Sequence, residues 1–162
     1  MNKTNSQTLI AYYSRSGNTG IAAKIIHELA GGDMFRIDTV KSYPSDYYET
    51  TDVAKEELRQ NARPSIVNPP ADISKYSTVY LGFPNWWSTM PMAVWTFLEM
   101  YDWSGKTIVP FCTHGGGGPG HCEKDIASLC PGARVHQALS IQATNVKAAQ
   151  PEIENWIAQV KK

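Results

Sequence analysis

The apolar residues of this chain switch repeatedly between two spacings, and this alternation constrains the fold more than any other feature. Residues 8–13, 78–83 and 107–112 form short continuous apolar runs, which are typical of strands covered on both faces. Residues 34–40 alternate like an edge strand, and residues 134–141 are a fifth strand candidate. Apolar residues between these runs recur at helical spacing. The pattern predicts an α/β fold, a doubly wound five-stranded parallel sheet with helices on both faces.

Two stretches fit this interpretation less well. Pro110 removes a hydrogen-bond donor from a strand expected in the interior of the sheet. Residues 39–77 are long for a single crossover, although residues 45–64 can form a helix within it. The chain shows no repeat and no linker, so we expect residues 1–162 to form one domain.

Composition excludes several classes of protein. Lys plus Arg and Asp plus Glu both number 15, giving a net charge of +0, and no basic run carries interleaved aromatic residues. We therefore expect no nucleic-acid partner. No apolar run is long enough for a membrane span, and the first residues do not resemble a secretion signal. Three cysteines without metal-ligand spacing fit a reducing, cytoplasmic location.

Three polar or glycine-rich loops follow predicted strands, and in such a sheet ligands bind at the carboxyl ends of the strands. The first loop, SRSGNT, opens a predicted helix and is rich in hydroxyl groups. Free amides and the positive end of a helix dipole favour an anion, so this loop predicts a phosphate site. The alternative is that Ser16 or Asn18 only caps the helix.

The other two loops supply aromatic and glycine residues. The second, PNWWSTM at residues 84–90, places Trp86 beside Trp87, and such indoles stack on flat heterocycles. Alternatively, one tryptophan belongs to the core and the other packs on a neighbouring helix. The third, THGGGGPG at residues 113–120, contains four consecutive glycines, as expected where backbone approaches a ligand closely; the alternative is a flexible tip. Together the loops predict a site for a phosphorylated planar heterocycle.

The first loop resembles the phosphate loop of the flavodoxin family, [ST]-x-[ST]-G-x-T, with Ser14, Ser16, Gly17 and Thr19 at its fixed positions. The stretches GFPNWWSTMPMAVWTFLE and SGKTIVPFCTHGGGG are similar to a branch of that family with a PxWW second loop. The resemblance extends over nearly the whole chain. It implies a sheet in the order 2-1-3-4-5 and one non-covalently bound FMN.

The resemblance also implies which residues surround FMN. The phosphate would be held by Ser14, Arg15, Ser16, Gly17, Asn18 and Thr19. One side of the isoalloxazine would be flanked by Pro84, Asn85, Trp86 and Trp87, and the other by Thr113, His114, Gly115, Gly116 and Gly117. We expect no catalytic residue and no metal ion.

The sequence is consistent with two functions. A flavodoxin-type electron carrier would exchange electrons with partner proteins, and no nicotinamide-binding segment is recognisable in the sequence. An FMN-dependent NAD(P)H reductase acting on a quinone or a similar acceptor is the alternative. Carriers of the family are usually strongly acidic, whereas this chain is neutral, and that difference favours the reductase.

We expect Cys112 to be buried beneath the third loop. His114 either donates to a flavin oxygen or faces solvent. Tyr43, Tyr47 and Tyr48 either pack near the mouth of the flavin site or anchor the long crossover.

Overall fold

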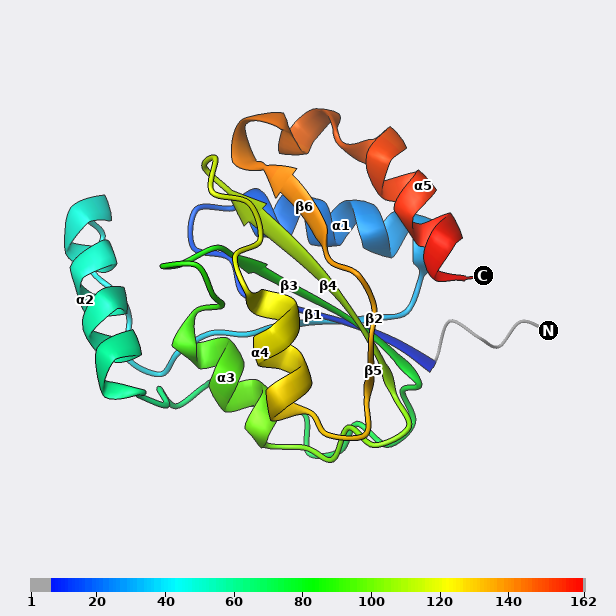
Figure 1. Cartoon of the computed structure of the whole chain (residues 1–162), viewed down its shortest axis with the longest axis horizontal. Coiled ribbons are helices and arrows are strands. Elements are labelled where there is room, and N and C mark those ends of the chain that lie inside the picture. Colours follow the sequence, from blue (N-terminus) through cyan, green and yellow to red (C-terminus); the bar gives the residue numbers. More distant parts are fainter. Residues whose placement is uncertain (1–6, 162) are drawn as a thin grey trace.

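Parallel strands form the centre of the protein, and the computed structural model describes residues 7–161. The strands are β1 (Thr8–Tyr12), β2 (Asp33–Arg36), β3 (Thr78–Pro84), β4 (Thr107–His114), β5 (Arg134–Val135) and β6 (Leu139–Gln142). They are arranged in the order β2-β1-β3-β4-β5, and β6 pairs with β4 beyond the end of β5 (Figure 1). The predicted doubly wound sheet and its 2-1-3-4-5 order are confirmed.

Helices cover both faces of this sheet. The helical elements are α1 (Asn18–Ala30), α2 (Tyr47–Gln60), α3 (Met92–Glu99), α4 (Cys122–Leu129), η2 (Ala143–Ala148) and α5 (Gln150–Val160). α3 and α4 pack on one face, and α1 and α5 pack on the other (Figure 1). No helix within residues 7–161 combines the length and the apolar content needed to cross a membrane.

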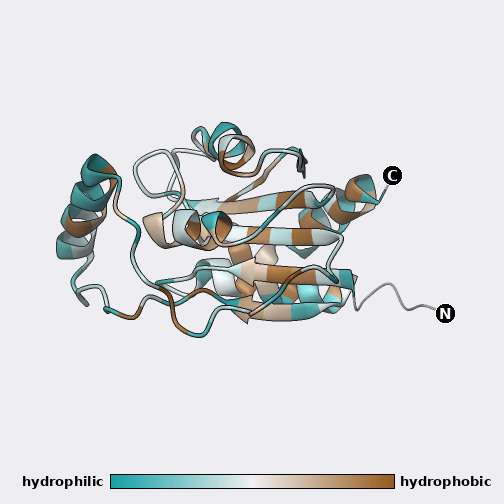
Figure 2. Ribbon diagram, turned by 90° about the horizontal axis from the view of Figure 1, so that it is seen from below, coloured by the Kyte–Doolittle hydropathy of each residue, from teal (hydrophilic) through white to brown (hydrophobic). Residues whose placement is uncertain are grey.

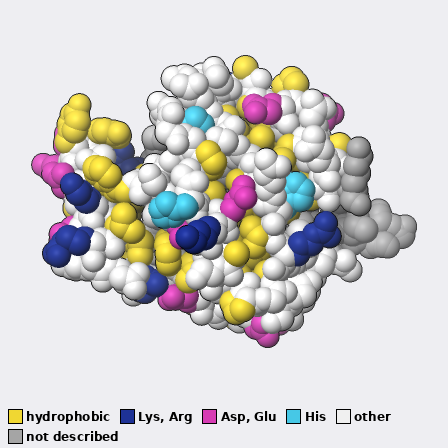
Figure 3. Space-filling view, viewed as in Figure 1, with side chains coloured by type: hydrophobic (Ala, Val, Ile, Leu, Met, Phe, Trp, Pro, Cys, Tyr) yellow, Lys and Arg dark blue, Asp and Glu magenta, His cyan; other side chains and the backbone are white. Residues whose placement is uncertain are grey.

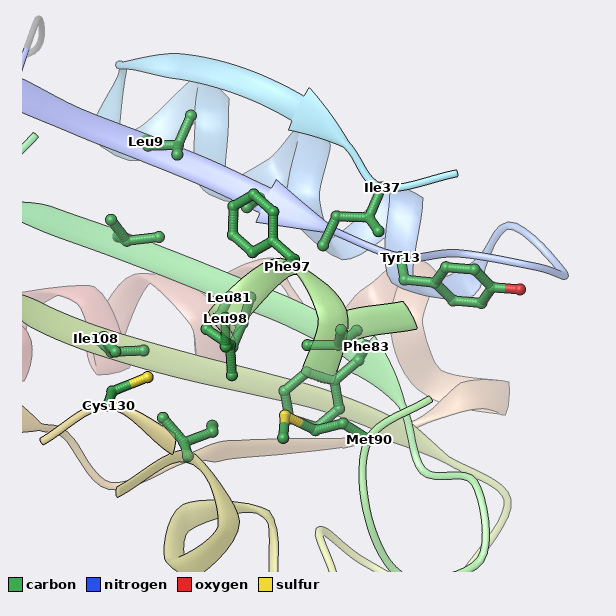
Figure 4. Packing of buried hydrophobic residues seen from close by; sticks show 14 of the residues in the cluster. Leu9, Tyr13, Ile37, Leu81, Phe83, Met90, Phe97, Leu98, Ile108 and Cys130 are labelled. Atoms are coloured by element: carbon green, nitrogen blue, oxygen red, sulfur yellow. The ribbon is translucent and has the colours of Figure 1, made fainter. Parts of the chain in front are cut away.

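Side chains alternate between two hydrophobic clusters along each central strand. Leu81 points to the α3 and α4 face, whereas its neighbour Tyr80 points to the α1 and α5 face. The strands are accordingly apolar along much of their length (Figure 2). In the first cluster Phe97 and Leu98 of α3 lie over the strands. Tyr13 lies at the end of this cluster near the carboxyl ends of the strands, and its hydroxyl points away from the cluster (Figure 4).

The cysteines belong to this packing. Cys112, Cys122 and Cys130 are all buried free thiols in the α3 and α4 cluster, as expected for Cys112. Burial raises the pKa of the Cys122 and Cys130 thiols to about 12. The thiols are therefore protonated at neutral pH and unreactive.

The prediction of one continuous fifth strand over residues 134–141 is wrong. The structure divides this stretch into β5 and β6. Pro110 of β4 explains the division. The carbonyl of Ile108 accepts from the amide of His136, so alternate residues of β4, including Pro110, face this neighbour. β5 ends opposite Ile108, and β6 begins opposite Phe111. The missing donor of Pro110 therefore lies against the interruption, where no ladder bond is lost.

The long crossover contains the expected helix, α2, in an unexpected position. The Asp46 carboxylate caps α2 by accepting from the amide of Glu49, and Asn61 ends the helix in a left-handed conformation. α2 lies to one side of the sheet, beyond the carboxyl ends of the strands, instead of covering a face (Figures 1 and 2). Exposed apolar side chains, including Tyr47 and Tyr48, gather over this side of the molecule (Figure 3).

Candidate functional site

The first loop connects β1 to α1. Gly17 is the N-cap residue, with φ 100°, and it offers no side chain to cap the helix. Within residues 7–161, the amide of Gly20 donates to Ser14 Oγ, whereas the amides of Asn18 and Thr19 bond to no side chain. Ser16 and Asn18 bond to each other instead, with the Asn18 Nδ2 donating to Ser16 Oγ over 3.3 Å. The alternative reading of Ser16 or Asn18 as a simple cap is therefore wrong. The free amides and the exposed Ser16 hydroxyl form a donor set suited to a phosphate.

Ser14 and Thr19 are buried and hold the loop in place. Ser14 Oγ accepts from the amide of Gly20 at 3.0 Å. The Thr19 hydroxyl bonds to the hydroxyl of Thr113 at 2.7 Å, which joins the first loop to the end of β4. Both threonines are nearly inaccessible, at 1% and 3% exposed. A direct contact between Thr19 and a phosphate stays a prediction.

Arg15 turns away from the other two loops. Its Nη2 donates to the carbonyls of Pro44 at 3.2 Å and Ser45 at 2.9 Å, just before α2 begins. The guanidinium therefore ties the first loop to the long crossover. A contact between Arg15 and FMN stays a prediction.

The second loop is a tight hairpin that separates its two tryptophans. Trp86 and Thr89 form an antiparallel bridge, and the two residues between them have φ values of 58° and 71°. Positive φ at both central positions is strained for residues other than glycine. The hairpin places Trp87 at its tip, 46% exposed.

The two indoles have different surroundings. Trp86 packs edge-on against Tyr13 and Tyr43, each with ring centroids 5.3 Å away. Trp87 lies against α2: its Nε1 donates to the carbonyl of Thr51 at 3.0 Å, and the Lys55 ammonium lies 5.2 Å from its ring. These contacts match the alternative of one tryptophan against the core and one on a helix. The predicted wall over the isoalloxazine stays a prediction.

Asn85 joins the second loop to the third. Its Nδ2 donates to the carbonyl of Gly118 at 2.6 Å, its Oδ1 accepts from the amide of Ser88, and its own amide donates to Thr113. Pro84, the last residue of β3, is half-buried beside it. Asn85 therefore sets the spacing between the two loops on either side of the candidate crevice.

The glycine loop leaves room for a ligand. A Cβ atom added to Gly115 or Gly116 would meet nothing within 4 Å, and one on Gly117 would meet only Asn85. Gly116 has φ 137°. The His114 side chain is half-buried, and its Nδ1 accepts from the amide of Gly116 at 3.0 Å.

Two polar clusters at this end of the molecule were not predicted from the sequence. Tyr43 donates to Glu57 of α2 at 2.7 Å, and burial together with this bond raises the tyrosine pKa. Asp125 accepts from the hydroxyl of Thr89 and lies 2.7 Å from His121 Nδ1. The spacing of four residues between His121 and Asp125 was a usable sequence signal, whereas the contact between Tyr43 and Glu57 was not.

The strand order and these loops define a class of protein. In a sheet of order 2-1-3-4-5 the winding reverses between β1 and β3, where the first and second loops begin, and the third loop follows β4 beside them, so the three loops together bound the candidate crevice. The model of the flavodoxin family matches residues 7–160, so the chain belongs to the flavodoxin family. FMN is the cofactor of that family, and the uncapped helix start and the open glycine loop fit its phosphate and its ring.

Solved structures extend the comparison. A protein from Bacteroides uniformis assigned as a flavoprotein is 29% identical, with a TM-score of 0.83 over 95% of this chain and 99% of that chain. A flavoprotein from Lactobacillus acidophilus, solved in complex with FMN, is 23% identical, with a TM-score of 0.69 over 88% and 97%. An NADH:FMN oxidoreductase in its apo form is 13% identical, with a TM-score of 0.61 over 94% and 87%. The last two show a shared fold only. No match was found among curated proteins.

Proposed function

We propose that this protein is an FMN-binding electron carrier of the flavodoxin type that exchanges electrons with partner proteins. The observation that carries the proposal is the start of α1 at the β1 and β3 switch point, where the amides of Asn18 and Thr19 bond to no side chain within residues 7–161 and the Ser16 hydroxyl is exposed. When bound there, FMN supplies reversible electron transfer. The protein binds the cofactor, orients it and limits its access to solvent.

Each loop has a distinct task in this proposal. The first-turn amides of α1 and Ser16 hold the phosphate, and Thr19 keeps the first loop against β4 through Thr113. Asn85 holds the second and third loops at a fixed separation, so the ring enters a crevice whose width is already set. A preformed crevice lowers the ordering cost of binding.

Several observations support a carrier acting in the cytoplasm. The sequence has no dinucleotide fingerprint, and Trp87 lies exposed at the rim, where a docking protein can reach it. The three unpaired cysteines suit a reducing compartment. Redox proteins are the proposed partners, without nucleic acid or membrane.

An FMN-dependent NAD(P)H reductase acting on a quinone is the second candidate. The net charge of +0 favours it, because a neutral surface offers no general attraction for a basic redox protein. The fold shared with an NADH:FMN oxidoreductase is compatible with it.

One experiment separates the two candidates. The purified protein is loaded with FMN, the flavin released by heat is identified, and the holoprotein is mixed with NADPH or NADH under nitrogen. A carrier contains one FMN per chain, leaves both nucleotides unoxidised, and takes up electrons on photoreduction. Saturable turnover of either nucleotide with a quinone would establish the reductase. A protein that stays colourless after incubation with excess FMN would refute both candidates.

A further inference from the structure

A second cavity lies on the other side of the first loop. It has a volume of about 560 Å³ and lies at the carboxyl ends of β1 and β2, beneath the segment that leads to α2. Its size is within the range of small-molecule sites. Its lining includes three charged residues, Arg15, Arg36 and Asp38, and the hydroxyl groups of Ser14, Thr39 and Ser42.

This cavity lies on the other side of β1 from the flavin crevice, although Ser14 and Arg15 of the first loop, which the family resemblance assigns to FMN, belong to its lining. The crevice lies at the ends of β1, β3 and β4, whereas β2 is on the opposite side of β1. The side chain of Arg15 reaches toward Pro44 and Ser45 on the β2 side, and Arg36 donates to the carbonyl of Ser14 at 2.8 Å from that same side. Neither Trp86 nor the glycine loop lines the cavity. The first loop is therefore the wall between two sites.

The charges in the cavity favour an anion that also carries hydroxyl groups. The lining carries two guanidinium groups and one carboxylate. Arg36 Nε donates to Asp38 at 3.1 Å, whereas Arg15 donates to the backbone carbonyls of Pro44 and Ser45. Among residues 7–161, Nη1 of each arginine has no hydrogen-bond partner. Guanidinium groups bind phosphates strongly, and a carboxylate accepts from sugar hydroxyls.

The position in the fold agrees with this chemistry. In doubly wound sheets that bind dinucleotides, an acidic residue or an arginine about 20 residues beyond the first loop reads the ribose or its phosphate. Here Arg36 is the last residue of β2, Asp38 follows it by two residues, and Arg36 follows Ser14 by 22 residues. The same end of the same strand thus presents both residue types.

We propose that this cavity binds a sugar phosphate, free or as part of a nucleotide, as a second ligand beside FMN. Arg36 and Arg15 hold the phosphate, and Asp38 accepts from a sugar hydroxyl. Binding at this site does not require electron transfer, because Arg36, Arg15 and Asp38 would bind the sugar phosphate whether the flavin is oxidised or reduced.

Calorimetric titration of the FMN-loaded protein with ribose 5-phosphate tests the proposal, with ribose and inorganic phosphate as partial ligands. We expect saturable binding of ribose 5-phosphate that is at least about tenfold tighter than binding of either part. Arg36→Gln should weaken it at least about tenfold. Arg59→Gln is the matched control, because it removes the same charge from an exposed arginine of α2 outside the cavity. Asp38→Asn should tighten inorganic phosphate while reducing the preference for the sugar phosphate.

Three results would overturn the proposal. The first is absence of saturable binding to the FMN-loaded wild type. The second is an equal loss in Arg59→Gln, which would indicate a general charge effect. The third is release of FMN as ribose 5-phosphate binds, which would assign the cavity to the phosphate of FMN. Flavin absorbance shows in every titration whether FMN is bound. A failure of the proposed FMN binding can therefore be distinguished from a failure of sugar phosphate binding.

Discussion

At the scale of single residues, hydroxyl groups in the first loop divide between binding and positioning. Ser16 is exposed beside the uncapped helix start, whereas Thr19 is buried and bonded to Thr113. A phosphate would therefore contact Ser16 and the free amides at the start of α1 directly. Thr19 would affect phosphate binding only indirectly, by holding the loop in position. This division is testable because FMN and riboflavin differ by only the phosphate.

Replacing both Ser16 and Thr19 with alanine should weaken FMN binding by about 3 kcal/mol, or about two factors of ten, because the Ser16 bond to the phosphate and the Thr19 bond that positions the loop against Thr113 are both lost. Riboflavin binding should change little. Fluorescence titration with each flavin measures both constants, and Ser128→Ala on the exposed side of α4 is the control. An equal loss for riboflavin would assign the two hydroxyls to loop structure alone.

Gly82 shows how one residue permits core packing. A Cβ atom at this position in β3 would lie 2.2 Å from Cζ of Phe111, which is fully buried on the neighbouring strand. The aromatic ring thus occupies the space above the glycine. Because the interior is closely packed, the ring has little freedom to move aside.

Gly82→Ala should destabilise the protein by about 1–3 kcal/mol through overpacking. Urea unfolding measures the loss. Phe111→Leu in the same chain should recover part of it, because the smaller side chain vacates the contested space, and the two changes should be non-additive. Full additivity would show that the alanine acts through something other than Phe111.

At the scale of elements, α2 is the unusual part of the fold. It lies beyond the carboxyl ends of the strands. Its Thr51 carbonyl accepts from Trp87 of the second loop, and its Glu57 carboxylate accepts from Tyr43 of the long crossover. Glu57 is the residue of α2 that faces Tyr43. Burial raises its pKa, although the bond from Tyr43 opposes that shift.

This raised pKa predicts a pH dependence of stability. A carboxyl with a higher pKa in the folded than in the unfolded chain stabilises the fold fully below its unfolded pKa, and this contribution is lost as pH rises through the folded pKa. The free energy of unfolding of the wild type minus that of Glu57→Gln should therefore fall as pH rises above 4.5. Urea unfolding at a series of pH values measures this difference.

The neighbouring Glu56 is a control of opposite sign. Its bond with Arg59 lowers its pKa, so the same difference for Glu56→Gln should fall as the solution becomes more acidic. Parallel trends for the two variants would contradict the assignment of Glu57 as the buried carboxyl of α2.

At the scale of the whole molecule, balanced charge distinguishes this chain from the acidic carriers of its family. Its 15 basic and 15 acidic residues give a net charge of +0 before FMN adds its phosphate. Long-range steering of a charged partner depends on an electrostatic field and is screened by salt. For the proposed carrier, partner choice would then depend mainly on short-range contacts near the cofactor.

We expect the oxidation of the reduced holoprotein by ferricyanide to depend weakly on salt, with a change of about twofold or less between about 0.01 and 0.15 M. Stopped-flow absorbance measures the rate. Lys124→Glu with Lys147→Glu, two exposed positions, makes the protein acidic and should slow the reaction at low salt. A steep dependence in the wild type would instead show that a local charged patch controls the encounter.

The sequence by itself determined the layered sheet, its helices and the three loops, because apolar periodicity and turn residues act over a few neighbouring positions. Only the tertiary structure decided the division of the fifth strand opposite Pro110, the separate surroundings of Trp86 and Trp87, and the cavity at Arg36. These features depend on contacts between distant positions, such as the bond between Thr19 and Thr113, 94 residues apart. Local spacing carries no information about such pairs, since folding alone brings them together.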